Sequence, residues 1–310
     1  MSYSYSSIST YSTCSLKYYF QYILKINFTD VGVAPILGQC LHKAIEFYYR
    51  NLGTTKIDFI NHFKFLYEDA FLTNNIIEYF PKHKETAYQM GLRAIEQFFE
   101  NDEMTNAKPA KYLLDENEIE AIELYFNLPL IDLKSGQNIG ENLHISGLID
   151  LVEQKDGKLK VKDHKTSSKD YEKFFITTSL QLAIYSYAVR FLLKEKKFKD
   201  VLVNKEESVG FNIFLKPKNK SELKIIEKKI STSDLENLYL TVKNLDKAVK
   251  NEIFIPANND SCFIYNTPCQ YMGICEAYQK NQQPFKNRIL DVDGLKKLYG
   301  ERVVVRNENK

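Results

Sequence analysis

Two aspartates and a lysine, Asp150, Asp163 and Lys165, lie on what the sequence predicts to be one β-hairpin. Asp156 and Gly157 form a two-residue turn signal, and on the return strand Asp163 and Lys165 alternate onto one face. Carboxylates are natural ligands of Mg2+ and Mn2+, which polarise a phosphate and lower the pKa of a bound water. A neighbouring lysine stabilises the transition state or orients the attacking water. The hairpin therefore predicts a metal-dependent site that cleaves phosphodiester bonds. A surface hairpin with ordinary charged residues is the alternative.

The segment after the hairpin predicts a helix that carries a second polar pair. Thr177, Thr178 and Ser179 are candidate N-caps, and apolar residues then recur at helical spacing. Gln181 and Tyr185 are four residues apart, so they lie one turn apart on one face. We expect both side chains to hold the site and contact the phosphate backbone. The alternative is a core Tyr185 and a solvent-facing Gln181.

Three short motifs follow one another in a fixed order: G-x-x-D at Gly147 to Asp150, D-x-K at Asp163 to Lys165, and Q-x-x-x-Y at Gln181 to Tyr185. In this order the sequence resembles the RecB-like, AddB-like branch of the PD-(D/E)XK nucleases, which includes exonucleases of CRISPR adaptation. A further motif of that branch, G-x-x-x-H, is present at Gly38 to His42. The resemblance spans residues 14 to 275.

The resemblance implies a divalent-metal shell for Mg2+ or Mn2+. Asp150 and Asp163 would bind the metal, and His42 and the backbone carbonyl of His164 would complete the shell. A histidine at the start of a helical stretch is more often structural or exposed. Glu46 follows His42 by one helical turn, and we expect it to lie behind the ligands.

The chain has five cysteines, and three of them, Cys262, Cys269 and Cys275, lie within fourteen residues. Their segment has a loop-like composition that suits a metal centre. By the resemblance, Cys14 joins these three to hold a 4Fe-4S cluster that pins the two ends of the domain together. Many relatives have two residues between the second and third cysteines, whereas here six separate Cys262 from Cys269. Zinc on the same thiolates, or unliganded buried cysteines, are the alternatives. Cys40 is expected to be a packed small hydrophobe.

The composition predicts a globular protein whose nucleic-acid contacts are local. The 310 residues carry a net charge of only +2, and 44% are hydrophobic. No apolar run of membrane-spanning length and no signal peptide are visible, so we expect a cytoplasmic protein without membrane contact. A basic track of lysines is expected beside the metal site. The alternative is a lysine-rich surface that is only solvated. The lysines of the expected track are Lys160, Lys162, Lys165, Lys169, Lys173, Lys216, Lys218 and Lys220. Among the 21 tyrosines and 20 phenylalanines, some could stack on unpaired bases, although most belong to the core.

Periodicity predicts the elements that position these residues. Helices are expected near residues 6 to 25, 38 to 51, 56 to 72 and 84 to 100, and a long charged helix at about 220 to 250. Strands are expected near 117 to 127, 143 to 154, 158 to 165 and 208 to 215. Glu118 and Glu120 on the first strand are candidates for a further carboxylate at the site, and the sequence does not choose between them.

These elements predict a single α/β domain over residues 1 to 310, with a restriction-endonuclease-like core in which helices flank a small mixed sheet. The helical elaboration covers about 1 to 110, the catalytic core about 111 to 220, and the helix with the iron-sulfur cysteine segment about 221 to 285, joined to Cys14.

We expect a metal-dependent DNA nuclease. By the resemblance, it is an exonuclease acting on DNA ends or single strands in recombination, repair or replication, with a helicase or a recombination or CRISPR-adaptation complex as its partner. The alternative is a non-catalytic iron-sulfur DNA-binding subunit or adaptor of such a complex. Action on RNA is a third option, for which no discriminating residue is found.

Overall fold

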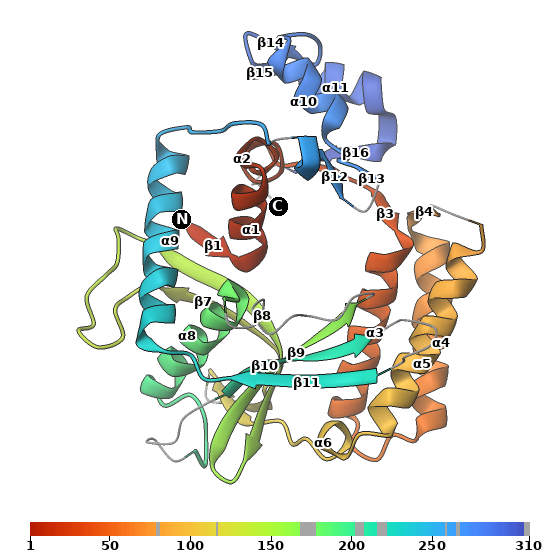
Figure 1. Ribbon diagram of the computed structural model, residues 1–310, viewed down its shortest axis with the longest axis vertical. Coiled ribbons are helices and arrows are strands. Elements are labelled where there is room, and N and C mark those ends of the chain that lie inside the picture. The colour runs from red at the N-terminus through yellow and green to blue at the C-terminus, as the bar shows by residue number, and fades with distance from the viewer. Residues whose placement is uncertain are drawn as a thin grey trace. The chain divides into compact units, whose positions relative to one another are not determined.

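The computed structural model describes residues 1–78, 81–115, 117–167, 178–201, 208–215, 222–257, 259–264 and 267–306. The chain forms two compact units (Figure 1). The larger contains Gly32–Leu240 and Ser2, and the smaller contains Met1, Tyr3–Val31 and Thr241–Lys310. In the described part of the chain, no helix combines the length and apolarity needed to cross a membrane.

The larger unit is built on a mixed sheet. Its strands lie side by side in the order β7 (Ile122–Pro129), β8 (His144–Lys155), β9 (Lys158–Ser167), β10 (Ser208–Leu215) and β11 (Glu222–Lys228). β9 and β10 run parallel, and the other neighbours run antiparallel. A mixed sheet flanked by helices confirms the predicted α/β class.

The hairpin of β8 and β9 forms as its turn residues predict. Asp156 and Gly157 both adopt positive φ, at 52° and 68°, the combination that a two-residue hairpin turn requires. Lys155 therefore pairs with Lys158, and Leu151 with Lys162. The turn fixes the register, and the register fixes which side chains share a face of the sheet.

Helices cover this sheet (Figure 1). α3 (Val33–Arg50), α4 (Lys56–Thr73) and α5 (His83–Phe99) pack against one another, and α8 (Leu180–Lys194) packs against β8 and β10. The hydroxyl of Ser179 caps α8 by accepting from the Leu182 amide, which confirms one of the three predicted N-caps. Cys40 is buried on the inner face of α3, as expected.

The predicted helix over 220 to 250 is wrong in its first part. Residues Glu222–Lys228 form the edge strand β11, which pairs antiparallel with β10, and the helix α9 begins only at Thr232 and ends at Lys250. Ser231 and Asp234 make a reciprocal cap that starts this helix. The isoleucines of KIIEK favour a strand, and the exposed edge of β10 provides the partner.

In the smaller unit, the first predicted helix is interrupted. α1 (Tyr5–Thr13) ends at Cys14, whose extended backbone (φ −159°) separates it from α2 (Ser15–Tyr18) and a π-helical turn (Tyr19–Ile23). The Sγ atom of Cys14 then caps α2 by accepting from the Lys17 amide at 3.3 Å. Cys14 thus lies at the break between the two helices and presents its sulphur there.

Segments from both ends of the chain share the core of the smaller unit. β2 (Ile26–Phe28) pairs with β16 (Val303–Val305), and the Tyr271 hydroxyl donates to the Ile26 carbonyl at 2.7 Å. α10 (Met272–Gln279) and α11 (Val292–Tyr299) complete this core.

The remaining described strands are β1 (Ser2–Ser4), β3 (Asp30–Gly32), β4 (Asn75–Ile77), β5 (Lys111–Leu114), β6 (Asn117–Glu120), β12 (Phe263–Ile264), β13 (Thr267–Pro268), β14 (Phe285–Lys286) and β15 (Ile289–Leu290). The remaining helices among the described residues are α6 (Asp102–Thr105) and two 3-10 turns, Asn259–Cys262 and Gly300–Arg302.

Candidate active site

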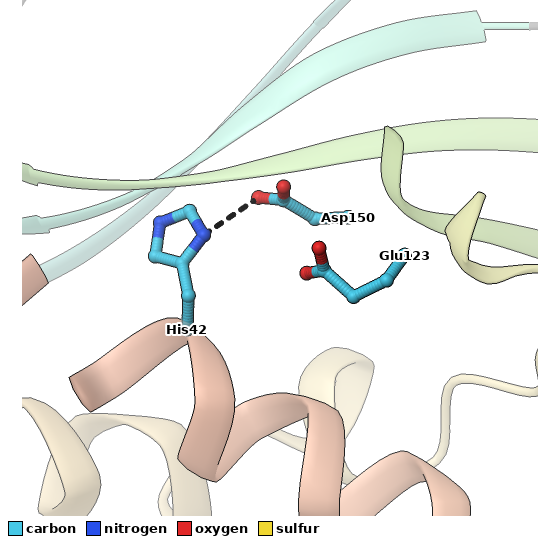
Figure 2. Close-up of side chains that lie close together, drawn as sticks. All are labelled: His42, Glu123 and Asp150. Atoms are coloured by element: carbon cyan, nitrogen blue, oxygen red, sulfur yellow. Dashed lines mark ion pairs between the residues drawn. The ribbon is translucent and has the colours of Figure 1, made fainter. Parts of the chain in front are cut away.

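Three ligand-type side chains converge at the centre of the larger unit. Asp150 comes from β8, Glu123 from β7 and His42 from α3, and one ligand atom of each lies within 4.8 Å of the others. Figure 2 shows the two carboxylates and the imidazole turned toward one another. The Nδ1 atom of His42 lies 3.3 Å from Oδ2 of Asp150. Oxygen and imidazole ligands suit Mn2+ and related divalent ions.

Sheet register brings the two carboxylates together. Ile122 pairs with Leu151, and Leu124 with Ile149, so Glu123 lies opposite Asp150 across the two strands. Glu123 has φ of 49°, in the left-handed region that non-glycine residues rarely enter and that is found at functional sites.

Asp163 lies at the centre of a second set of contacts. Its Oδ2 atom is 2.6 Å from the Nζ atom of Lys165. Its Oδ1 atom accepts from Gln181 Nε2 at 2.9 Å and from the Tyr185 hydroxyl at 3.2 Å. Gln181 also donates to the Tyr185 oxygen at 2.9 Å. Both helix residues are buried, so the alternative of a solvent-facing Gln181 is wrong.

The two aspartates are neighbours across the hairpin. Leu151 pairs with Lys162, and one step further along each strand the register faces Asp150 toward Asp163. The backbone amide of His164 donates to Oδ2 of Asp150 at 2.7 Å. The structure therefore brings together Asp150, Asp163, Lys165, Gln181, Tyr185 and His42.

The charges of this cluster shift several pKa values. Burial and the charge of Asp150 raise the pKa of Asp163 to about 6. Burial and the same aspartate raise the pKa of Glu123 to about 7. Burial alone would lower the pKa of His42, but the hydrogen bond and charge of Asp150 raise it to about 9. Burial opposes ionisation of Asp150 as well, yet His42 keeps its pKa below the usual value. Such a concentration of buried carboxylates favours a cation.

The imidazole of His164 lies edge-on to that of His42, with ring centroids 6.0 Å apart, and its other contacts are to α3 and β10. Its Nδ1 atom is 3.3 Å from Asn212 Nδ2, and its ring stacks against Tyr49 with centroids 6.4 Å apart. Burial lowers the pKa of His164 to about 4, so the imidazole is neutral at pH 7. Metal ligation by its backbone carbonyl stays a prediction.

Lys160 and Lys162 do not belong to a basic track beside the site. Lys162 is buried and forms ion pairs with Glu103, at 2.9 Å, and with Glu227. Lys160 lies 3.2 Å from Glu227. Strand alternation turns both lysines to the face opposite Asp163, where carboxylates neutralise them. Five lysines of the predicted track and one candidate N-cap lie outside the described residues: Lys169, Lys173, Lys216, Lys218, Lys220 and Thr177.

Glu123 is the carboxylate that sequence reasoning missed. Glu118 instead forms surface ion pairs with Lys199 at 2.5 Å and Lys111 at 3.5 Å, and Glu120 lies on the same β5–β6 hairpin. The segment IELYFNLP did carry a signal, because its polar residues alternate with Ile122, Leu124 and Phe126 from Glu123 onward.

Glu46 lies beside the ligands without joining them. Its Oε1 atom is 2.8 Å from Nε of Arg50, and Arg50 also donates to the Ile122 carbonyl at 3.1 Å. A cleft of about 360 Å³ opens here, lined by Gly38, Gln39, His42, Lys43, Glu46 and Glu123. The cleft leads from the surface to the His42 and Glu123 side chains.

The smaller unit brings four cysteines near one another. Cys14, Cys269 and Cys275 pack against one core cluster, and the Cys269 amide donates to the Cys262 carbonyl at 2.8 Å. Burial raises the pKa of Cys275, and neighbouring Cys14, Cys262 and Cys269 raise it further. Gln279 donates to the Cys275 sulphur at 3.1 Å. The segment is less loop-like than expected, because Cys275 lies in α10.

Comparison with known proteins identifies the family. The family model of the PD-(D/E)XK nuclease superfamily matches residues 2–276. The chain belongs to this superfamily. Members are nucleases that hydrolyse phosphodiester bonds and generally use Mg2+ or Mn2+, and membership implies DNA as the substrate. The match also confirms the predicted restriction-endonuclease-like fold.

Solved structures similar to this PD-(D/E)XK protein are distant in sequence. A "putative exonuclease" from Eubacterium rectale shares 10% identity, with 87% of this chain and 91% of that chain covered and a TM-score of 0.47. The protein SSO0001 shares 14% identity over 76% and 82% of the two chains, with a TM-score of 0.28. No curated protein matches the sequence.

Proposed function

We propose that this PD-(D/E)XK protein is a divalent-metal-dependent deoxyribonuclease of the RecB-like branch. It acts in the cytoplasm as an exonuclease on DNA ends or single strands, in recombination, repair or replication. The observation that carries the proposal is the convergence of Asp150, Asp163 and Lys165 on one face of the sheet, with His42 beside Asp150.

The residues present fit a divalent metal ion. Asp150, Glu123 and His42 would hold it, and Asp163 and the His164 carbonyl are the further ligands that the family resemblance suggests. A hard cation would offset the buried negative charge that raises the pKa of Asp163 and Glu123. When bound, it supplies a polarised phosphate and an acidified water.

Lys165 is the cationic group that assists the reaction. Its ammonium lies 2.6 Å from Asp163 Oδ2, so it is held where it orients the attacking water or stabilises charge at the scissile phosphate. Gln181 and Tyr185 fix the other oxygen of Asp163. Burial keeps the pKa of Tyr185 far above its usual value, so the phenol remains a donor.

The test is a nuclease assay with end-labelled single- and double-stranded DNA, titrated with Mg2+ and with Mn2+. The wild-type protein should degrade DNA only with metal. Asp150→Ala, Asp163→Ala and Lys165→Ala should abolish cleavage while leaving DNA affinity, measured by fluorescence anisotropy, largely intact. Lys199→Ala is the matched control, because Lys199 pairs with Glu118 on the surface.

Two outcomes would contradict the proposal. Full activity of one variant removes that residue from the mechanism. Persistent DNA binding by the wild-type protein without product in either metal would favour the adaptor function. Product ladders from DNA labelled at either end separate exonucleolytic from internal cleavage.

A second part of the proposal concerns the cysteines. Cys14, Cys262, Cys269 and Cys275 hold a 4Fe-4S cluster, which supplies a covalent link between the two ends of the chain. Two N–H···S contacts support thiolates here, from the Lys17 amide to Cys14 and from Gln279 to Cys275. Anaerobically purified protein should be brown and contain iron and acid-labile sulphide. Colourless protein with stoichiometric zinc would overturn the assignment.

A further inference from the structure

Two large apolar side chains stand exposed beside the metal ligands. Tyr125 on β7 and Leu148 on β8 are 65% and 44% exposed, and the two residues pair directly across the strands. Single exposed hydrophobes are ordinary on protein surfaces. This pair is notable for its position, because Tyr125 is two residues from Glu123 on β7 and Leu148 is two residues from Asp150 on β8.

Strand alternation and cross-strand pairing place Tyr125, Leu148 and Asp150 on the same face. Leu148 and Asp150 are two apart on β8, so both project to one side, and Tyr125 shares that side because it pairs with Leu148. The intervening Leu124 and Ile149 are buried on the other side. Two residues of strand span roughly 7 Å. The Tyr125 and Leu148 pair therefore lies within reach of a base next to a phosphate at the metal site.

The same face continues without carboxylates. Asn127 pairs with Ser146, and Pro129 with His144. Moving away from the metal ligands along β7 and β8, a DNA strand would therefore meet apolar and then polar groups, of which Asn127 and Ser146 accept from the Ser2 hydroxyl at 3.1 and 3.0 Å. This track lacks the like charges that would repel phosphates, so the charge pattern favours a nucleic-acid strand over a basic partner.

We propose that Tyr125, supported by Leu148, stacks on an unpaired base of the DNA strand whose phosphate is bound at the metal site; the inference rests on the proposed nuclease function. An aromatic ring stacks on any base, so it selects DNA whose bases are accessible and does not select a base sequence. Bases inside a duplex are already stacked on their neighbours, whereas bases of single strands and frayed ends are free. The pair thus selects single-stranded DNA.

A purely structural role makes a different prediction. Cross-strand aromatic and aliphatic pairs also stabilise a sheet, and Tyr125→Leu keeps an apolar partner for Leu148 while removing the aromatic ring. Tyr125→Phe keeps the ring and removes only the hydroxyl. If Tyr125 serves the sheet alone, the two variants should differ in thermal stability and not in DNA binding.

The experiment uses the full chain, Mn2+ and an oligonucleotide with 2-aminopurine at its single-stranded end and cleavage-resistant phosphorothioate linkages. The metal site then stays filled while the DNA stays intact. Fluorescence quenching reports stacking, and anisotropy reports affinity. Tyr125→Leu should lose the quenching and bind single-stranded DNA about 5- to 150-fold more weakly, the range for loss of one base-aromatic stack. Tyr125→Phe should behave like the wild type. Phe65→Leu is the matched control, because Phe65 is also 65% exposed but lies on α4.

An abasic nucleotide at the reporter position gives an independent measurement that needs no protein variant. It should weaken binding of the wild-type protein as much as Tyr125→Leu does, and it should not weaken the variant further. Unchanged quenching and affinity in Tyr125→Leu, or an abasic site without effect on the wild type, would overturn the proposal.

The outcomes separate this inference from the proposed function. Wild-type protein that shows Tyr125-dependent quenching but no cleavage in Mg2+ or Mn2+ would remove the nuclease proposal and keep the stacking site. Cleavage that depends on Asp150, with quenching independent of Tyr125, would keep the nuclease proposal and remove the stacking site.

Discussion

Nδ1 of His42 lies 3.3 Å from Oδ2 of Asp150 and joins helix α3 to the centre of the sheet. The contact connects residues that are far apart in the sequence. In the metal-free protein it is an ion pair, because Asp150 raises the pKa of His42 to about 9 even though burial alone would lower it. A metal ion would compete with the proton for this imidazole.

Metal affinity should therefore rise with pH. Below the His42 pKa of about 9, binding must displace a proton, because only neutral imidazole ligates a metal. Between about pH 7.5 and 9, we expect Mn2+ affinity to rise by up to about tenfold per pH unit. Calorimetry in buffers of different ionisation enthalpy measures the proton release. His42→Gln should release fewer protons, and a pH-independent wild-type affinity would argue against histidine ligation.

Glu123→Gln should lower the nuclease activity and raise the stability of the metal-free fold. The folded pKa of Glu123 is raised to about 7 from 4.5, so its charged form destabilises the metal-free fold. This destabilisation is absent below the unfolded pKa and complete above about pH 7. At pH 8 the variant should gain on the order of 1–3 kcal/mol in urea unfolding, and it should bind Mn2+ more weakly. Glu118→Gln, in a surface ion pair, is the control. Loss of stability in Glu123→Gln would contradict the burial argument.

Gln181 should act by positioning Asp163. Its amide donates to both Asp163 Oδ1 and the Tyr185 oxygen, so Gln181→Ala leaves Asp163 free to turn away. Groups that orient metal ligands typically contribute about 10- to 100-fold in affinity or activity, and we expect kcat to fall within that range with little change in KM. Gln181→Glu, which places a second carboxylate beside Asp163, should lower activity further as pH rises. An unchanged kcat in Gln181→Ala would remove the positioning role.

Lys162 should matter for stability and not for DNA. Its ammonium is buried between Glu103 and Glu227, and Lys162→Ala leaves two carboxylates without their cation. Loss of one partner of a buried pair costs about 3–5 kcal/mol, and here we expect about 2–4 kcal/mol because Glu103 is partly exposed. Urea unfolding measures this. DNA affinity of the folded variant should equal that of the wild type. A large loss of affinity would show that Lys162 belongs to the DNA-binding basic track.

The cysteine proposal predicts different effects for two cysteines. Cys14→Ser should lose the visible absorption of the cluster and lower the melting temperature, because a group bound only by the native state stabilises it. Cys40→Ser should keep the absorption, because Cys40 is buried on α3, in the larger unit. Full cluster absorption in Cys14→Ser, equal to that of Cys40→Ser, would exclude Cys14 as a ligand.

Local periodicity determined much of this protein from the sequence. Asp156 and Gly157 set the hairpin, alternation put Asp163 and Lys165 on one face, and a four-residue spacing put Gln181 beside Tyr185. The structure shows each arrangement. These relationships span a few residues, so backbone geometry alone fixes them.

Tertiary structure decided the relationships between distant segments. Glu123, and not Glu118 or Glu120, faces Asp150 because the register of β7 on β8 places it there. Lys162 is buried because α6 and β11 bring Glu103 and Glu227 to it, and β11 is a strand because β10 offers it an edge. Each outcome depends on which surfaces bury one another, and long-range packing overrides local propensity where the local preference is weak.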